Sequence, residues 1–187
     1  MWRERMRNSL TELAEGKTPT PPPPIERQNE FNDAELASGI GTPLADAAAR
    51  SDHLLGEIIE LYRSLGEQPF RWYAAGNTTE AVLRSSFIHP RTHLFAYLNE
   101  NGEQDRANAL FESAYSDMKD AGAPPLIMHT VTYNLACARA RQGRSEEALD
   151  LLGEVLPARP DMMELSAKDP DLVALHDDPR FQKLIKG

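Results

Sequence analysis

Apolar residues recur every three or four positions along most of the chain, which is the spacing of helices that bury one face. This pattern predicts helices over residues 2–13, 42–65, 77–101, 103–119, 126–142 and 145–156, and shorter helical turns over 162–167 and 170–185. Residues 25–41 are weakly patterned and are expected to form a loop with one helical turn. No useful stretch alternates apolar and polar residues, so no strand is expected. The prediction is an all-α protein: a partial antiparallel helical bundle that continues into a short array of helical hairpins.

Capping residues and prolines set the expected boundaries of these helices. The expected N-terminal caps are Thr42, followed by Pro43 in the first helical position, Asn77, which pairs with Glu80, and Ser145. Pro90 falls inside a predicted helix, so we expect a kink or a break there. Residues 18–24 contain five prolines and are expected to form an extended polyproline II arm after the first helix.

Two segments of the chain are similar when they are aligned 41 residues apart. The matched pairs are Gly102 with Gly143, Ala107 with Ala148, and Phe111 with Leu152. Each segment reads as a helix, a glycine turn and a second helix with a small residue at a close-packing position. Units of this kind bury their apolar faces only by stacking on one another.

The second of these units, over residues 133–152, resembles a tetratricopeptide repeat (TPR). The matching residues are Leu135, Ala136, Gly143, Ala148, Leu152 and Pro160. Thr132 and Arg139 depart from the family pattern, which usually has a bulky apolar residue and an aromatic residue there. The segment over residues 91–121 is a poorer match. The tail resembles the closing segment of bacterial repeat arrays, in which Leu172, Leu175, Phe181 and Leu184 would seal the last helix pair.

His89 and His93 are four residues apart, so they share one face of a helix. Two imidazoles so placed can bind a zinc, nickel or iron ion. Because a catalytic zinc usually has three protein ligands, this pair is incomplete by itself. Two ordinary histidines, one capping and one packed, remain the alternative.

The order of features over residues 1–100 resembles the last three quarters of a DinB-like four-helix bundle of the ClbS/DfsB type. These features are the charged helix at Trp2, the proline-rich loop, Gln28 to Asn32, Pro43, His53 and the His-x-x-x-His pair. The resemblance implies that His89 and His93 act with a third histidine shortly before the position of Trp2. That position and the first helix are absent, so the chain is truncated, its start is misassigned, or the domain has become a scaffold. His53 is a weak substitute for the third ligand.

The sequence therefore predicts an incomplete DinB-like bundle over residues 1–100 and TPR-like repeats with a capping tail over residues 101–187. The favoured hypothesis is a protein-interaction or scaffold module that binds a protein or peptide through the TPR-like region. The alternative is a metal-dependent DinB/ClbS-type hydrolase or thiol transferase that acts on a reactive small molecule with zinc or nickel. A generic helical hairpin without a partner also stays open, as does one continuous solenoid without a flexible linker over residues 98–104.

Composition narrows these hypotheses. The net charge of −9 and a pI of about 5.0 argue against nucleic-acid binding. No apolar run approaches the roughly 18 residues of a membrane span, and no signal peptide is evident, so we expect a cytoplasmic protein. Cys137 is the single cysteine, which excludes an internal disulfide, and it is expected to be buried and inert. A truncated bundle would expose the apolar side of the helix over residues 2–13, which makes a homodimer an expectation.

Overall fold

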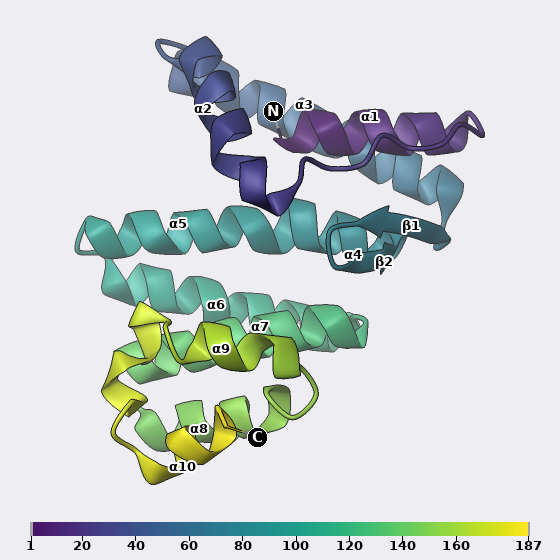
Figure 1. Cartoon of the computed structure of the whole chain (residues 1–187). Coiled ribbons are helices and arrows are strands. Elements are labelled where there is room, and N and C mark those ends of the chain that lie inside the picture. Colours follow the sequence, from purple (N-terminus) through teal and green to yellow (C-terminus); the bar gives the residue numbers. More distant parts are fainter. Residues whose placement is uncertain (1, 187) are drawn as a thin grey trace. The chain divides into compact units, whose positions relative to one another are not determined.

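The protein is all-α apart from one small β-hairpin (Figure 1). The computed structural model describes residues 2–186, without the side chain of Ser38. The chain divides into two compact units, Met1–Phe87 and Ile88–Gly187. This division precedes the boundary expected at residue 100, so both histidines of the pair belong to the C-terminal unit. Among the described residues, no helix has both the length and the apolar content that a membrane crossing requires.

The N-terminal unit is built on two packed helices. Its helices are α1 (Trp2–Ala14), α2 (Gln28–Gly39), α3 (Leu44–Leu65) and α4 (Thr78–Leu83). α1 packs along α3, and Met6 and Leu10 on α1 are fully buried. An exposed apolar side was expected on the first helix, and that expectation is wrong because α3 covers this side.

Ion pairs and hydrogen bonds accompany the contact between α1 and α3. The guanidinium of Arg3 donates to the backbone oxygen of Ser51 at 2.8 Å, and Arg7 lies 3.3 Å from a carboxylate oxygen of Glu57. Arg3 and Arg7 therefore serve the polar edges of this contact.

Residues 28–39 form the helix α2, which corrects the loop expected from the weak pattern. No described side chain of α2 is buried. Arg5 of α1 forms an ion pair with Glu35, and the guanidiniums of Arg5 and Arg27 each lie 5.3 Å from the ring centre of Phe31. Cation–π and charge contacts hold this helix, so its sequence lacks the apolar stripe that reveals most helices.

A two-stranded antiparallel hairpin joins α3 to α4, where no strand was expected. It consists of β1 (Pro69–Trp72) and β2 (Ala75–Asn77). Phe70 and Trp72 are buried and their rings stack 5.9 Å apart, while Tyr73 in the turn has a positive φ of 53°. The strands are too short to give a readable alternation, and burial of these aromatic side chains stabilises the hairpin.

Of the three expected N-terminal caps, Asn77 is confirmed, whereas Thr42 and Ser145 do not occupy the cap position. Asn77 caps α4 as predicted, because its side-chain oxygen accepts from the backbone N–H of Glu80 at 2.8 Å. Thr42 is not a cap: α3 begins at Leu44, and Pro43 occupies the cap position without a side-chain bond. Ser145 is the first helical residue of its helix instead of the residue before it.

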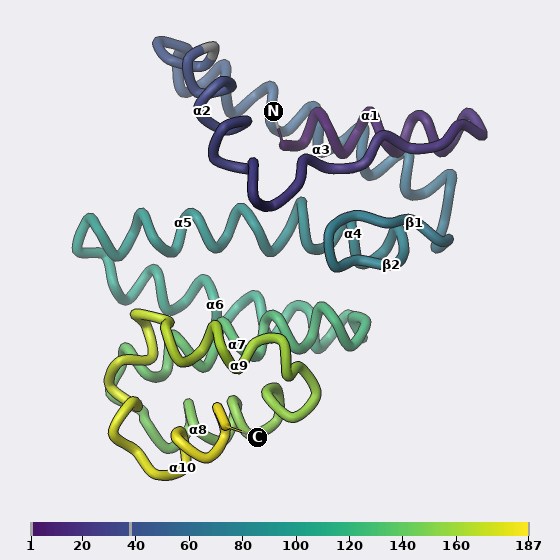
Figure 2. The backbone as a smooth tube through the Cα atoms, in the orientation of Figure 1, coloured from purple at the N-terminus to yellow at the C-terminus, as the bar shows by residue number. Residues whose placement is uncertain are grey.

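The prolines of residues 18–24 form an extended arm beside α1 (Figure 2). Pro24 has φ −54° and ψ 141°, which are polyproline II values. The arm is fixed at Thr20, whose backbone N–H and hydroxyl donate to the carboxylate of Glu12. The hydroxyl of Ser9 donates to the backbone oxygen of Thr20. The arm is therefore held on the surface of its own unit.

The C-terminal unit is a stack of antiparallel helices followed by a tail. Its helices are α5 (His89–Glu100), α6 (Gln104–Asp120), α7 (Pro125–Arg141), α8 (Ser145–Val155), α9 (Met163–Ser166) and α10 (Pro179–Leu184). A π-helical turn over Arg84–Ile88 precedes α5, and Pro90 lies in the first turn of that helix. The proline therefore follows an irregular turn at the start of a new α-helix.

The positions matched by the 41-residue alignment are equivalent in the structure. Gly102 and Gly143 have φ values of 77° and 73° in the turns between helices, which glycine adopts at the lowest cost. Ala107 and Ala148 are both fully buried, on α6 and α8. The chain thus repeats one helical hairpin, α5 with α6 and then α7 with α8.

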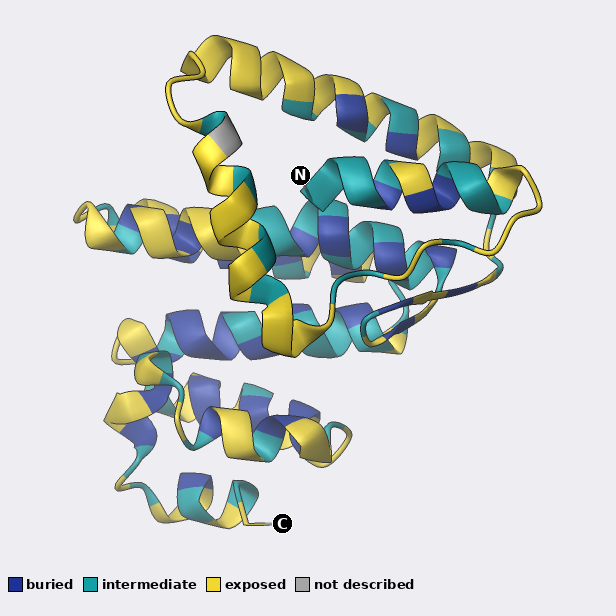
Figure 3. Ribbon diagram, turned by 45° about the horizontal axis from the view of Figure 1, so that its top comes forward, coloured by how far each residue is buried: buried dark blue, intermediate teal, exposed yellow. Residues whose placement is uncertain are grey.

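The tail closes one end of this stack (Figure 3). Leu172, Leu175 and Phe181 are fully buried in one apolar cluster with residues of α7 and α8, and Leu184 packs against it. A 3₁₀ turn over Pro170–Leu175 packs on α7. These are the four residues that the sequence analysis expected to seal the last helix pair.

The sealing role of the tail is testable with two neighbouring residues. Leu175→Ala should lower the free energy of unfolding by about 2–5 kcal/mol, because it leaves a cavity in the cluster. Val173→Ala on the same turn should change it by less than about 0.5 kcal/mol, because that side chain is 60% exposed. Urea denaturation of both variants measures the difference, and equal losses would contradict the sealing role.

Candidate functional site

The histidine pair lies on α5 with its two ring nitrogens facing each other. The Nε2 atoms of His89 and His93 are 3.1 Å apart, and the ring centres are 4.5 Å apart with the planes perpendicular. His93 is exposed and His89 is half-buried. The structure therefore brings together the two residues that the sequence singled out.

The third histidine implied by the DinB-like resemblance does not lie beside this pair among the described residues. Among the described residues of the C-terminal unit, no third histidine, cysteine or acidic ligand atom joins the two imidazoles. His53, the weak substitute, lies on α3 in the N-terminal unit, where its side chain is 75% exposed and its Nε2 lies 3.9 Å from Glu57 Oε1. The described ligand set is thus two nitrogens.

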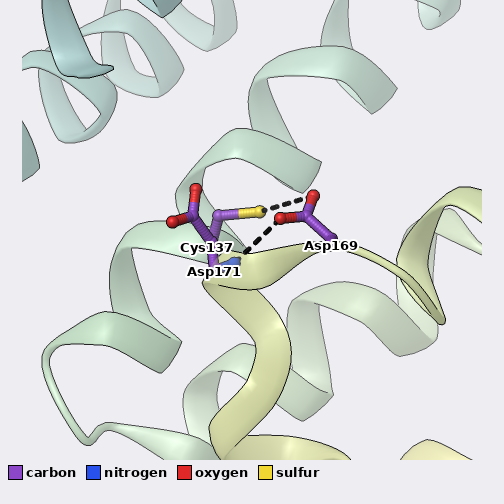
Figure 4. Close-up of side chains that lie close together, drawn as sticks. All are labelled: Cys137, Asp169 and Asp171. Atoms are coloured by element: carbon purple, nitrogen blue, oxygen red, sulfur yellow. Dashed lines mark hydrogen bonds between the residues drawn. The ribbon is translucent and has the colours of Figure 1, made fainter. Parts of the chain in front are cut away.

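A second group of potential ligands lies between α7 and the tail (Figure 4). One ligand atom each from Cys137, Asp169 and Asp171 lies within 4.8 Å of the others. A thiolate and two carboxylates can hold a divalent metal. This group was not expected from the sequence, because Cys137 and Asp169 are 32 positions apart and share no local motif.

Hydrogen bonds already occupy most of this second group. Asp169 accepts from the hydroxyl of Tyr133 at 2.8 Å and from the backbone N–H of Asp171 at 2.9 Å. Its contact with the thiol of Cys137 is longer, at 3.9 Å. Asp171 accepts from the guanidinium of Arg141 at 2.8 Å. A metal ion would compete with these partners, so the present arrangement fixes the start of the tail.

Burial favours the protonated forms of Cys137 and Tyr133 in this region. Desolvation, reinforced by the carboxylates of Asp169 and Asp171, raises the pKa of the Cys137 thiol well above its usual value. Desolvation also raises the pKa of Tyr133. The thiolate is the nucleophilic and metal-binding form, so burial of this thiol disfavours its reaction. The buried position expected for Cys137 is confirmed.

An open depression of about 660 Å³ lies between α1 and α3 in the N-terminal unit. It is lined by Arg7, Thr11, His53, Gly56, Glu57, Glu60 and Leu61. Arg7 pairs with Glu57 inside the depression, and Glu60 pairs with Arg63, which lies outside its lining. The depression contains no nucleophile and base within hydrogen-bond distance among the described contacts.

Comparison of the chain with protein-family models, with curated proteins and with solved structures found no match. The fold by itself defines the class: an all-α protein with a repeated helical hairpin, a closing tail and a pair of adjacent histidines on α5.

The pKa values of Cys137 and Tyr133 are raised in the folded chain. The free energy of unfolding should therefore depend on pH in the alkaline range. The unfolded chain releases the thiol proton near pH 8.5, whereas the native chain retains it, so the free energy of unfolding should fall as pH rises above about 8.5. Cys137→Ala should reduce this slope by up to about 1.4 kcal/mol per pH unit. Val131→Ala, buried on the same helix and not ionisable, should leave the slope unchanged. Urea titrations from neutral to alkaline pH measure both, and identical slopes for all three proteins would contradict the assignment.

Proposed function

We propose that the chain is a protein-interaction module of the TPR type, fused to an incomplete DinB-like bundle, and that α5 carries its binding face. The observation that supports this proposal is the exposure of two large side chains on α5. Leu94 is 44% exposed and Tyr97 is 59% exposed. They are three residues apart, so they are neighbours on the helix surface.

The two sides of α5 differ in what covers them. Phe95 and Leu98 are buried in a cluster with Phe111 and Ala138, whereas Leu94 and Tyr97 lie outside that cluster. At the other end of the stack, the tail buries the equivalent apolar surface of α8. Exposed apolar side chains on a helical array commonly mark a contact surface, and tyrosine is frequent at the centres of such contacts.

The N-terminal unit has a supporting role in this proposal. In this unit α1 packs against α3. The side chain of His53 on α3 is exposed, as described above. We therefore propose that this unit acts as a scaffold. We also propose a cytoplasmic location, with which the unpaired Cys137 is compatible.

Site-specific crosslinking tests the proposed binding face. The photo-reactive residue benzoylphenylalanine in place of Tyr97 should crosslink the full chain to a partner protein in the cells of origin. The same residue in place of Val173, which has a similar exposure of 60% but lies on the sealing turn, is the matched control. A product that forms equally at both positions, or at neither, would overturn the proposal.

A metal-dependent hydrolase or thiol transferase of the DinB/ClbS class is the second candidate, favoured by the 3.1 Å distance between the two Nε2 atoms. His89 and His93 would hold zinc or nickel, and the ion would activate water or a thiol. This function requires a further ligand beyond the two histidines.

Metal analysis tests this second candidate. The purified full chain should contain close to one equivalent of zinc or nickel, and His93→Ala should reduce it by at least about tenfold. The control is His53→Ala, which removes an exposed histidine from the other unit and should leave the metal content unchanged. A wild-type chain with less than about a tenth of an equivalent would exclude this function.

A further inference from the structure

We propose that the end of the N-terminal unit at which α2 is joined to α3 is a docking surface for a basic amphipathic helix of another protein. This surface, the α2–α3 corner, has four apolar and two acidic side chains, which are Leu36, Ile40, Leu44, Ala47, Asp33 and Asp46. It belongs to the N-terminal unit, whereas the binding face proposed above lies on α5, so the inference goes beyond that function.

The apolar stripe of α3 continues past the start of α1. Leu54 on this stripe is buried where α1 packs along α3. Steps of three and four residues along the helix lead from Leu54 back to Ser51, Ala47 and Leu44, so all four lie on one face. Arg3, near the start of α1, bonds to Ser51. Beyond that point the stripe is uncovered, and Leu44 is 84% exposed (Figure 3).

α2 presents a second apolar stripe on the side that faces away from α1. Phe31 and Glu35 of α2 contact Arg5 of α1. Because successive residues of a helix are turned by about 100°, Leu36 and Ile40 lie roughly opposite that contact. Their side chains are 64% and 75% exposed. The backbone N–H of Ile40 donates to the carbonyl of Leu36 at 3.1 Å, so Ile40 continues the last turn of α2.

A short link holds the two stripes close together. Ile40 and Leu44 are four residues apart, so their Cα atoms are at most about 14 Å apart. Gly41 in the link has a φ of 86°, and the backbone N–H of Thr42 donates to the carbonyl of Gly39 at 3.1 Å. Both stripes therefore end at one hydrogen-bonded turn. A helix of about 15 residues is about 22 Å long, which is enough to reach both.

The charges around the corner favour a basic partner. Residues 25–49 contain five acidic residues and one arginine, so their formal charge is −4. The arginine, Arg27, pairs with Glu30, whereas Asp33 and Asp46 are exposed and form no ion pair with another described residue. A second copy of the same surface or an anionic membrane would be repelled. Lysine or arginine beside apolar residues would be attracted.

A helix suits this surface because the protein already covers the same stripe with a helix. α1 packs on the part of the stripe that contains Leu54, and a partner helix would extend this packing toward Leu44. Apolar residues at every third or fourth position of the partner would contact Leu36 and Leu44, and its basic residues would lie near Asp33 and Asp46.

A synthetic peptide with a fluorescent label is the probe for this proposal. It has about 15 residues, with leucine at every third or fourth position and lysine on the other faces. Fluorescence anisotropy with the full chain should give a Kd below about 100 μM, which should rise with salt concentration. A peptide of the same composition with its leucines spread around the helix should bind at least about tenfold more weakly. Absence of binding, or equal binding of both peptides, would overturn the proposal.

Serine substitutions test whether the peptide lies on the corner. Leu36→Ser and Leu44→Ser should each weaken binding by about fivefold or more, because each removes apolar contact area. The matched control is Val173→Ser in the C-terminal unit, where the side chain has a similar exposure of 60%, and it should leave binding unchanged. Surface substitutions of this kind keep the fold. A loss at only one of the two corner positions, or an equal loss in all three variants, would contradict the proposal.

Charge substitutions separate the corner from the net charge of the chain. Asp33→Asn together with Asp46→Asn should weaken binding by about threefold at low salt and have no effect at high salt. Asp105→Asn together with Asp177→Asn removes two exposed acids from the C-terminal unit and should have a smaller effect. If the two double variants behave alike, the peptide responds only to net charge and the proposal is wrong.

Tyr97→Ser distinguishes this proposal from the binding face on α5. The substitution should leave binding of the peptide unchanged. A peptide that loses affinity in Tyr97→Ser and keeps it in Leu44→Ser would overturn the corner while supporting the face on α5. Crosslinking from position 97 without any peptide binding would likewise refute the corner alone.

Discussion

The burial of α7 constrains everything else in the C-terminal unit. Nine of its 17 residues are buried, so α6, α8 and the tail must each fit against a different side of the same helix. Small residues such as Ala136 and Ala140 make this close approach feasible, and they meet the equally small Ala148 of α8 in one cluster. Interiors packed at this density leave little room for substitution, so the array depends on the sequence of its central helix.

The same constraint accounts for the surroundings of Thr132 and Arg139, the two residues that depart from the repeat pattern expected from the sequence. Thr132 is small enough to lie buried within α7. The guanidinium of Arg139 contacts Glu112 on α6, Gln142 beyond the end of α7 and Glu147 on α8. An arginine in this half-buried position must have partners, because an unpaired charge there would be costly. These contacts of Arg139 therefore link α6, α7 and α8 at this position. The bond from Tyr133 to Asp169 does the same for the tail.

Local periodicity predicted the features whose causes are local. The helical hairpins, the glycine turns, the cap at Asn77 and the pairing of His89 with His93 all depend on residues within a few positions of one another. α2 escaped prediction because Phe31 is held by arginines from outside the helix, and the β-hairpin escaped because its strands have only four and three residues. The group of Cys137, Asp169 and Asp171 could not be found by any local pattern, since the fold alone brings the tail back to α7.

His93 and the exposed Tyr97 are four residues apart on α5, so they lie on the same stripe of the helix. A catalytic metal works best where the protein encloses substrate and excludes water, yet His93 is exposed and Tyr97 beside it is largely exposed. The tail already closes the other end of the array through Leu172, Leu175 and Phe181. The packing therefore leaves the exposed side chains of α5 as the place for the binding face that we propose.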